Sequence, residues 1–324
     1  MITRIVITGG PCAGKTTGLS WIQNSFAKKG YKVIFVPETA TELISNGVAP
    51  WTCGSNLDYQ ICQVSLQLEK ERIFMQAAQS MPDEKILIVC DRGVMDNRAY
   101  MNDEEFEAVM KKLGVSEVSL RDGYDGIFNL VTAAKGAEEY YTTDNNGART
   151  ETPEEARELD DRVISAWTGH PHLRIIGNET DFEQKMIRLI REISSLLGEP
   201  EPYEIERKFL IEYPDTGMLE AMPNCRRVDI IQTYLIAPEG EEIRVRQRGE
   251  NGSYAYYQTA KKKVDDITRL ESERRLTQEE YLTLLMEADP ALRPIRKQRY
   301  CLTWNEQYFE IDVYPFWDDK AIVE

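Results

Sequence analysis

The sequence has little histidine, no paired-cysteine motif and no excess of basic residues. It contains two histidines, His170 and His172, and six cysteines with no C-x-x-C spacing. A histidine- or cysteine-based metal site is therefore not expected, and any metal is predicted to be a hard cation held by carboxylates. The scattered cysteines favour free thiols in a reducing cytosol over a disulfide framework.

Long apolar runs are also missing. The longest strongly apolar run, residues 86–90, is far short of the roughly 20 residues that a membrane-spanning helix requires. The first four residues lack the basic and apolar regions of a signal peptide. The formal net charge is −16, which argues against a basic nucleic-acid-binding domain. We therefore expect a cytoplasmic protein with no transmembrane segment and no nucleic-acid partner.

The length of 324 residues suggests about two domains. In the first 198 residues, short β-rich runs at 4–8, 32–36, 85–90, 126–131 and 173–176 alternate with helical stretches. This alternation predicts an α/β domain, with a parallel sheet covered by helices on both faces. Residues 135–167 are polar and acidic with several arginines, and we interpret them as a mobile flap.

The pattern changes at Gly198-Glu199-Pro200-Glu201-Pro202, which is typical of a linker. After it the hydrophobic period becomes two, which predicts strands at 204–211, 230–236, 242–248, 253–263, 269–276, 299–304 and 308–313, with one helix near 278–287. The predicted domains are a nucleoside-triphosphate-binding domain at 1–197, a linker at 198–202 and a mainly antiparallel β domain at 203–324.

A phosphate-binding motif follows the first predicted strand. The run matches G-x-x-x-x-G-K-[ST] and lies between a strand and a helix, as the motif requires. Its glycines let backbone N–H groups converge on phosphate oxygens, while the lysine reaches the β- and γ-phosphates and the threonine hydroxyl ligates Mg²⁺. The predicted nucleotide-binding residues are Gly9, Gly10, Pro11, Cys12, Ala13, Gly14, Lys15, Thr16 and Thr17.

Two carboxylates and two arginines complete this predicted site. Asp91 ends an apolar strand, where a carboxylate would face the metal, and Glu38 ends the second strand, where it could accept a proton from a substrate hydroxyl. The alternative for Asp91 is a capping or turn aspartate, and the alternative for Glu38 is an acid stabilised by a helix N-terminus. Arg149 and Arg157 lie in the predicted flap and would close on the phosphates, unless they are ordinary helix-surface charges.

The base preference is left open by the sequence. Asn178-Glu179-Thr180-Asp181 half-resembles the N-K-x-D guanine-reading motif, but Thr180 with Glu183 also matches a helix capping box, which we favour. Both ATP and GTP therefore remain candidates.

The first 197 residues resemble the P-loop kinase-like AAA group that includes NadR-type nucleotide kinases. The runs that carry the resemblance are GGPCAGKTT, VPETATELI, ILIVCDRG and EARELDDRVISAWTGHPHLRIIGN. The resemblance implies a five-stranded parallel sheet and nucleoside-triphosphate binding.

In the second half, charged residues repeatedly share one face of a predicted strand. Carboxylate-rich and cation-rich faces recur over many strands, which favours a closed barrel with an inward polar face over solvent-exposed strands. Grouped carboxylates bind metal, and grouped Arg and Lys bind a polyanion, so together they predict a polyphosphate tunnel with Mg²⁺ or Mn²⁺. The shared faces are Glu204, Glu206 and Lys208; Arg244, Arg246 and Arg248; Thr259, Lys261 and Lys263; Arg269, Glu271, Glu273 and Arg275; and Glu310 with Asp312.

Residues 203–324 resemble CYTH domains, the triphosphate tunnel metalloenzymes. The signature E-x-E-x-K is present as Glu204-Ile205-Glu206-Arg207-Lys208, and EIRVRQR, YYQTAKKK, RLESERRL, KQRY and YFEIDVY follow in the family's order. The resemblance implies an eight-stranded antiparallel tunnel. It places Glu204, Glu206, Glu271, Glu273 and Asp312 near the metals and Lys208, Arg244, Arg246, Lys261, Arg296 and Arg299 on the phosphates, with Arg296 chosen over Lys297.

The whole chain is similar to animal P-loop–CYTH proteins implicated in TRP-channel trafficking, a family associated with GTP and phosphatidic-acid binding. We therefore predict a Mg²⁺-dependent NTPase or kinase-like module joined to a triphosphatase whose catalytic carboxylates are Glu204 and Glu206, with Glu38 and Asp91 serving the first module. One alternative is a nucleotide-gated binding protein for an anionic lipid or another phosphorylated ligand. A further alternative is an adenylate cyclase of the CYTH class.

Overall fold

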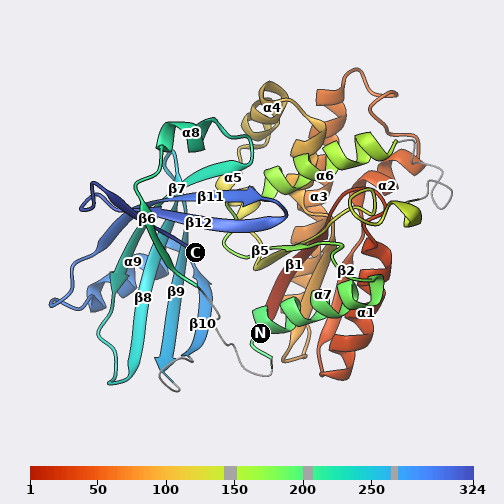
Figure 1. Cartoon of the computed structure of the whole chain (residues 1–324). Coiled ribbons are helices and arrows are strands. Elements are labelled where there is room, and N and C mark those ends of the chain that lie inside the picture. Colours follow the sequence, from red (N-terminus) through yellow and green to blue (C-terminus); the bar gives the residue numbers. More distant parts are fainter. Residues whose placement is uncertain (142–151, 200–206, 264–268) are drawn as a thin grey trace. The chain divides into compact units, whose positions relative to one another are not determined.

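The computed structural model describes residues 1–141, 152–199, 207–263 and 269–324 (Figure 1). The chain divides into two compact units, Met1–Arg191 and Glu192–Glu324. The predicted linker at 198–202 falls partly outside the described residues, and the domain bounds stay a prediction.

The first unit is built on a five-stranded sheet with the order β2-β3-β1-β4-β5. All of its strand pairs are parallel, which confirms the predicted α/β class of this part. The strands are β1 (Ile2–Thr8), β2 (Lys32–Val36), β3 (Ile86–Asp91), β4 (Gly126–Leu130) and β5 (Leu173–Ile176).

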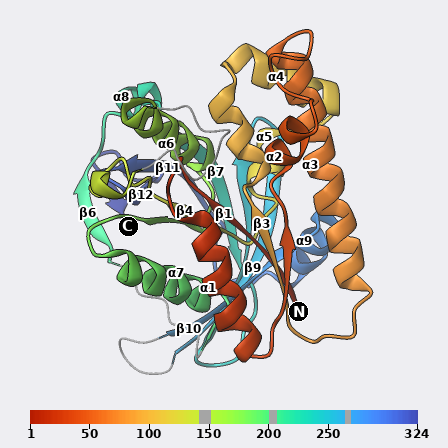
Figure 2. The same cartoon turned by 90° about the vertical axis from the view of Figure 1, so that its right-hand side faces the viewer.

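Helices cover both faces of this sheet (Figures 1 and 2). On one face lie α1 (Lys15–Lys28) and α7 (Phe182–Leu196), which pack so closely that a Cβ added to Gly18 would lie 3.1 Å from Leu189. On the other face lie α3 (Asn56–Gln79) and α6 (Pro153–Trp167), as right-handed crossovers require. The shorter elements are α2 (Thr39–Ser45), η1 (Val94–Tyr100), α4 (Asp103–Leu113), α5 (Glu117–Arg121) and η2 (Glu138–Tyr140).

The core of the first unit lies along the central strands. Ile5, Ile7, Leu87, Ile88 and Ile127 are all 0% exposed, as expected for strands of a parallel sheet buried on both faces. In the part of the chain that is described, no helix combines the length and the apolar character needed to cross a membrane.

The second unit holds a separate eight-stranded sheet with the order β10-β9-β8-β7-β11-β12-β13-β6, and its pairs are antiparallel. Its strands are β6 (Phe209–Glu212), β7 (Cys225–Tyr234), β8 (Glu241–Glu250), β9 (Ser253–Lys263), β10 (Arg269–Leu276), β11 (Ile295–Trp304), β12 (Gln307–Val313) and β13 (Lys320–Val323). The helical elements of this unit are α8 (Thr216–Ala221), α9 (Gln278–Leu284) and η3 (Leu285–Glu287).

The prediction of a closed barrel is wrong for the described residues. The sheet ends at β6 and β10, and none of the described pairings joins these two strands. The described part of the first strand, β6, has only four residues, and its strand partners are all on β13, so no described strand lies hydrogen-bonded beside the free edge of β10. The antiparallel eight-stranded sheet is thus confirmed, whereas its closure into a tunnel is not.

Candidate functional site

The phosphate loop connects β1 to α1 through backbone conformations that glycine favours. Gly9 has φ 134° and Gly14 has φ 87°. A Cβ added to Gly9 would lie 1.9 Å from the Leu130 carbonyl oxygen, and one added to Gly14 would lie 2.6 Å from Cε2 of Phe182. The loop therefore needs both glycines, and it ends at the positive N-terminus of α1.

Lys15 begins α1 and folds back over the loop. Its Nζ donates to the carbonyl oxygens of Gly9 at 2.9 Å and Gly10 at 2.8 Å. Burial and the nearby Arg92 lower the pKa of Lys15 to about 7, although Glu38 and Asp91 act in the opposite direction. A group with this pKa gains charge when an anion approaches, which suits contact with phosphate. Thr16 and Thr17 are exposed on the first turn of the same helix.

A buried carboxylate anchors the loop from α6. Asp160, which is 0% exposed, accepts from the backbone N–H of Gly10 at 2.8 Å and of Thr132 at 3.3 Å. Lys135 donates to its other oxygen at 3.1 Å. Sequence reasoning missed Asp160. The available signal was its place among the apolar positions of α6, where an aspartate is unusual.

A buried lysine anchors the loop from α7. Lys185 is 3% exposed, and its Nζ donates to the carbonyl oxygens of Ala13 at 3.3 Å and Val131 at 2.7 Å and to Oδ1 of Asn178 at 2.7 Å. Asn178 in turn donates to the carbonyl oxygen of Thr132 at 2.8 Å. Sequence reasoning missed Lys185 as well.

The two predicted carboxylates lie at neighbouring strand ends. Asp91 ends β3 and Glu38 follows β2, and these strands pair up to Val36 and Cys90. Burial raises the pKa of Glu38, but Arg92 and the Thr41 hydroxyl outweigh it and leave that pKa lowered. Burial and then Glu38 raise the pKa of Asp91. Both carboxylates therefore lie near Lys15, and their pKa values are shifted in opposite directions, down for Glu38 and up for Asp91.

Arg92 and Asp96 join this site, and sequence reasoning did not select either. Nε of Arg92 donates to Glu38 at 2.6 Å, and its NH1 donates to Asp96 at 3.2 Å. Asp96 also accepts from the Thr8 hydroxyl at 2.6 Å and from Nε1 of Trp167 at 2.5 Å. The positive φ of Arg92, 67°, turns the chain sharply after β3. The D-R-G run was the only sequence signal for this turn.

The predicted flap at 135–167 requires correction. Its second half is α6, which begins with a capping box between Thr152 and Glu155 and buries Val163 and Trp167 at 0% exposure. A helix with a buried face is not a mobile flap. Arg157 of this helix donates to the carbonyl oxygen of Ala134 at 2.6 Å. Arg149 lies outside the described residues, so the phosphate role of both arginines stays a prediction.

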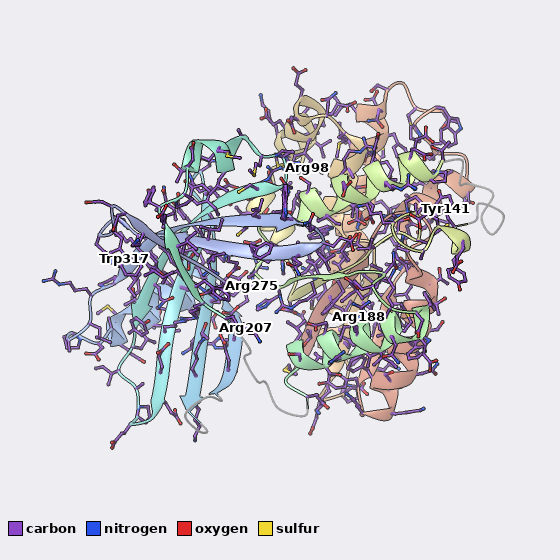
Figure 3. The ribbon with its side chains drawn as sticks, viewed as in Figure 1. Arg98, Tyr141, Arg188, Arg207, Arg275 and Trp317 are labelled. Carbon is purple, nitrogen blue, oxygen red and sulfur yellow. The ribbon has the colours of Figure 1, made fainter. Side chains whose placement is uncertain are left out.

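The proposed capping box at Thr180 is also wrong. Asp181 accepts from the backbone N–H of Gln184 at 2.8 Å and therefore caps α7 itself. Arg188 on the same helix donates to the carbonyl oxygen of Gly177 at 2.8 Å (Figure 3). Guanine reading by Asp181 is not tested by these contacts.

The second unit carries many of the predicted charges on a buried face of its sheet. Arg246, Lys261 and Arg299 are 9%, 7% and 6% exposed, and Asp312 is 1% exposed. Such low exposed fractions show that these charged side chains do not lie on a solvent-exposed face of the sheet. Figure 3 shows the side chains of this unit, with Arg275, an exposed residue of β10, labelled.

Ion pairs connect the cations and carboxylates of this face. Arg299 donates twice to Asp312, at 2.7 Å each. Lys261 lies 3.2 Å from Glu271, and Arg246 pairs with Glu273. The sheet thus brings together Arg246, Lys261, Glu271, Glu273, Arg299 and Asp312, all of which the sequence singled out.

The choice of Arg296 over Lys297 is wrong. Arg296 is exposed, whereas Lys297 pairs with Asp312 beside Arg299. The physical reason is the two-residue period of a strand, which puts Lys297 and Arg299 on one face. Burial and the neighbouring Arg299 lower the pKa of Lys297 to about 8.

Not every group on this face is paired. Among the described residues, the buried Nε atoms of Arg244 and Arg246 have no hydrogen-bond partner.

Lys208 forms an ion pair with Glu324 at 2.7 Å, and the Glu324 carboxylate is also 3.7 Å from Arg299. Sequence reasoning did not select Glu324.

The metal ligands expected in this unit remain predictions. Glu204 and Glu206 lie outside the described residues. In the described ranges, no group of three or more His, Cys, Asp or Glu residues has an arrangement that could hold a metal.

Comparison with known proteins shows the family to which the first unit belongs. A family model described as AAA domain matches residues 4–185, which is more than half of the chain, and the chain belongs to this family. The site is accordingly that of a nucleotide-binding P-loop domain of the kinase or NTPase kind. No curated protein matches the chain.

One similar solved structure is that of the PH1012 protein from Pyrococcus horikoshii OT3. It is 17% identical, and the match covers 37% of this chain and 77% of that chain with a TM-score of 0.29. A similarity of this size carries no argument about fold or function.

Proposed function

We propose that residues 1–197 bind ATP or GTP with Mg²⁺ and hydrolyse or transfer the γ-phosphate. The observation that carries this proposal is the glycine-dependent loop ending at Lys15, with Glu38 and Asp91 at the adjacent strand ends. Lys15 would contact the β- and γ-phosphates, and Glu38, whose pKa is lowered, is ionised at neutral pH and can accept a proton.

The residues present fit a bound Mg²⁺. Thr16 is an exposed residue of the first turn of α1 and Asp91 ends β3, and their hydroxyl and carboxylate groups are oxygen ligands of the kind that Mg²⁺ takes. When bound, the ion would neutralise negative charge on the phosphates. Burial and then the neighbouring Glu38 raise the pKa of Asp91, and a bound cation would act in the opposite direction.

The direct test is calorimetric titration of the full chain with ATP and GTP in the presence of Mg²⁺, followed by assay of released phosphate. Binding of at least one nucleotide supports the proposal and identifies the base preference. If neither nucleotide binds, the proposal for this unit is rejected.

For residues 203–324 we propose binding and metal-dependent hydrolysis of an inorganic or organic triphosphate, as the CYTH resemblance implies. The supporting observation is the buried cationic face, on which the Nε atoms of Arg244 and Arg246 have no partner among the described residues. Buried donors without partners are costly, and phosphate oxygens would satisfy them. Glu204, Glu206, Glu271, Glu273 and Asp312 are the proposed carboxylates for Mg²⁺ or Mn²⁺.

The products distinguish this proposal from its alternatives. Orthophosphate from tripolyphosphate or a nucleoside triphosphate supports a triphosphatase. Pyrophosphate with a cyclic nucleotide supports a cyclase. No turnover together with binding to phosphatidic-acid vesicles supports a lipid-binding protein.

A further inference from the structure

The first unit contains a cavity of about 630 Å³ away from the phosphate loop. Its lining comes from the first half of β1, the second half of α3, the start of η1 and the chain in and just after α5. No residue of the candidate nucleotide site described above lines it. Pockets that bind small molecules typically measure about 300–1,000 Å³, so the cavity is large enough for a ligand of its own.

Arg4 brings unused hydrogen-bond donors to this cavity. A guanidinium group carries five N–H donors. Among the described residues, NH1 of Arg4 donates to Oε2 of Glu71 at 3.3 Å, NH2 donates to the carbonyl oxygen of Gly123, and Nε has no partner. The Arg4 side chain lines the cavity and is only 20% exposed. Because unsatisfied donors with little access to water are costly, a ligand that supplies oxygen acceptors would be stabilised beside Arg4.

The charges and the apolar walls of the cavity indicate the class of ligand. The charged lining residues are two cations, Arg4 and Arg72, and one anion, Glu71. Arg72 also pairs with Glu69, but both side chains are more than half exposed, and such pairs contribute little. A carboxylate on an apolar body would match both the excess cation and the apolar walls. Those walls are Leu68, Met75, Val94 and Leu120.

One path of hydrogen bonds connects the cavity to the candidate nucleotide site through Tyr124. Its hydroxyl donates to Oε1 of Glu71 at 2.9 Å and accepts from the backbone N–H of Val94 at 3.1 Å. Val94 begins η1, the segment that carries Asp96. The position of η1, and with it that of Asp96, is therefore fixed in part by a residue that lines the cavity.

A second path runs through Gln67. Its Nε2 donates to Oε1 of Glu71 at 3.4 Å and to the carbonyl oxygen of Arg92 at 3.3 Å. The Arg92 side chain in turn donates to Glu38. Glu71 is thus bonded on one side to Arg4 and on the other to groups that hold the backbone of the nucleotide site.

We infer that this cavity is an effector site for a small organic monocarboxylate with an apolar body, and that its occupation raises the affinity of the first unit for nucleotide. The coupling rests on the proposed nucleotide binding. The carboxylate accepts from Arg4 and the apolar body fills the space beside α3. A filled cavity restrains Glu71 and Tyr124, and through them η1 and Arg92, so that the nucleotide has less of its site to order when it binds.

The first experiment measures binding of three probes to the full chain by calorimetric titration without nucleotide. The probes are phenylacetate, 3-phenylpropionate and indole-3-acetate. We expect at least one to bind with a Kd of about 1 mM or lower, and its uncharged amide to bind roughly tenfold more weakly. Arg4→Lys keeps the charge but loses the planar set of donors, and should weaken binding about tenfold.

A cavity-filling variant and its matched control locate the probe. Met75→Trp enlarges a side chain that lines the cavity and should abolish probe binding. Ile73→Trp makes a comparable change on the same helix at an exposed position outside the lining, and should leave binding unchanged. Circular dichroism checks that the variants fold. If Met75→Trp does not fold, Arg4→Lys decides, and wild-type affinity in Arg4→Lys would overturn the inference.

The second experiment repeats the titrations with ATP and GTP in Mg²⁺ at a saturating concentration of the bound probe. Nucleotide affinity should rise about fivefold or more in the wild type and in Ile73→Trp, and stay unchanged in Met75→Trp. Because linkage is reciprocal, saturating nucleotide should raise the affinity for the probe by the same factor.

Several outcomes would overturn the inference. These are no binding of any probe, equal binding of the acids and their amides, equal losses in Met75→Trp and Ile73→Trp, and a nucleotide affinity that a bound probe leaves unchanged or lowers. Failure of the wild type to bind either nucleotide would instead reject the proposed function. Since the probes are first titrated without nucleotide, their binding still decides whether the cavity is a ligand site.

Discussion

The carboxylate of Asp160 accepts a hydrogen bond from the backbone N–H of Gly10 at 2.8 Å, although 150 residues separate them. This bond ties α6 to the phosphate loop. The same carboxylate holds the N–H of Thr132 and the ammonium group of Lys135. The shape of the loop therefore depends on a helix that the motif itself does not contain.

Replacement of Asp160 should damage both the fold and the site. Asp160→Ala leaves two backbone donors and the Lys135 charge without their buried partner, and we expect a loss of about 3–5 kcal/mol in the free energy of unfolding. Asp160→Asn keeps an oxygen acceptor and should therefore lower the free energy of unfolding by less than Asp160→Ala does. Urea unfolding of the full chain measures both, with Glu158→Ala, an exposed position of the same helix, as the control, because Asp161 also binds Lys135. Wild-type stability in Asp160→Ala would contradict the anchoring role.

Lys15→Ala should weaken nucleotide binding while the fold stays intact. Loss of a charge-assisted hydrogen bond costs about 1.5–3 kcal/mol, or roughly ten- to a hundredfold in affinity. Calorimetric titration with ATP and GTP measures the effect, and circular dichroism checks the fold. Unchanged affinity for both nucleotides would refute the role of the motif.

Nucleotide affinity should fall as the pH rises above about 7. The free protein holds Lys15 at a pKa of about 7, and phosphate contact should raise that pKa. The bound state then carries one more proton than the free state between the two values, so affinity falls up to tenfold per pH unit there and is insensitive to this group below pH 7. Titrations in buffers of different ionisation enthalpy measure the proton uptake. Lys15→Ala is the control, and equal uptake in both proteins would disprove this assignment.

Glu204→Gln combined with Glu206→Gln should eliminate metal-dependent triphosphate hydrolysis and leave nucleotide binding by the first unit unchanged. An amide lacks the charge that a hard cation requires, and without the metal no activated water forms. Phosphate release from tripolyphosphate across a Mg²⁺ and Mn²⁺ series measures this. Full activity in the double variant would exclude these carboxylates from the reaction.

Arg246 and Arg296 offer a matched comparison on the second sheet. Arg246 is 9% exposed with an unpartnered Nε among the described residues, whereas Arg296 is exposed. Arg246→Met should reduce tripolyphosphate affinity at least tenfold, and Arg296→Met should leave it unchanged. Calorimetric titration measures both variants. Equal losses would show that binding depends on general positive charge rather than on the buried face.

Regular elements of the first unit were predictable because their signals are local. The five strand runs match β1 to β5 within two residues, and the loop motif is contiguous in sequence. Asp160 and Lys185 could not be predicted, since each acts on the loop from a distant helix. The sequence favours Thr180 as the cap of α7, whereas Asp181 is the cap in the structure, because two adjacent residues with capping side chains cannot be separated by local pattern alone.

By itself the sequence determined the local features of this protein: the phosphate loop, the alternation of strands and helices in the first unit and the two-residue period in the second. Only the tertiary structure decided that the second sheet is open among the described residues, that Lys297 rather than Arg296 lies beside Arg299, and that Arg92 and Asp96 surround the nucleotide site. The physical reason is the distance along the chain over which each interaction acts. Backbone propensity and periodicity act over a few residues, whereas sheet register and the pairing of buried charges depend on which distant segments pack together.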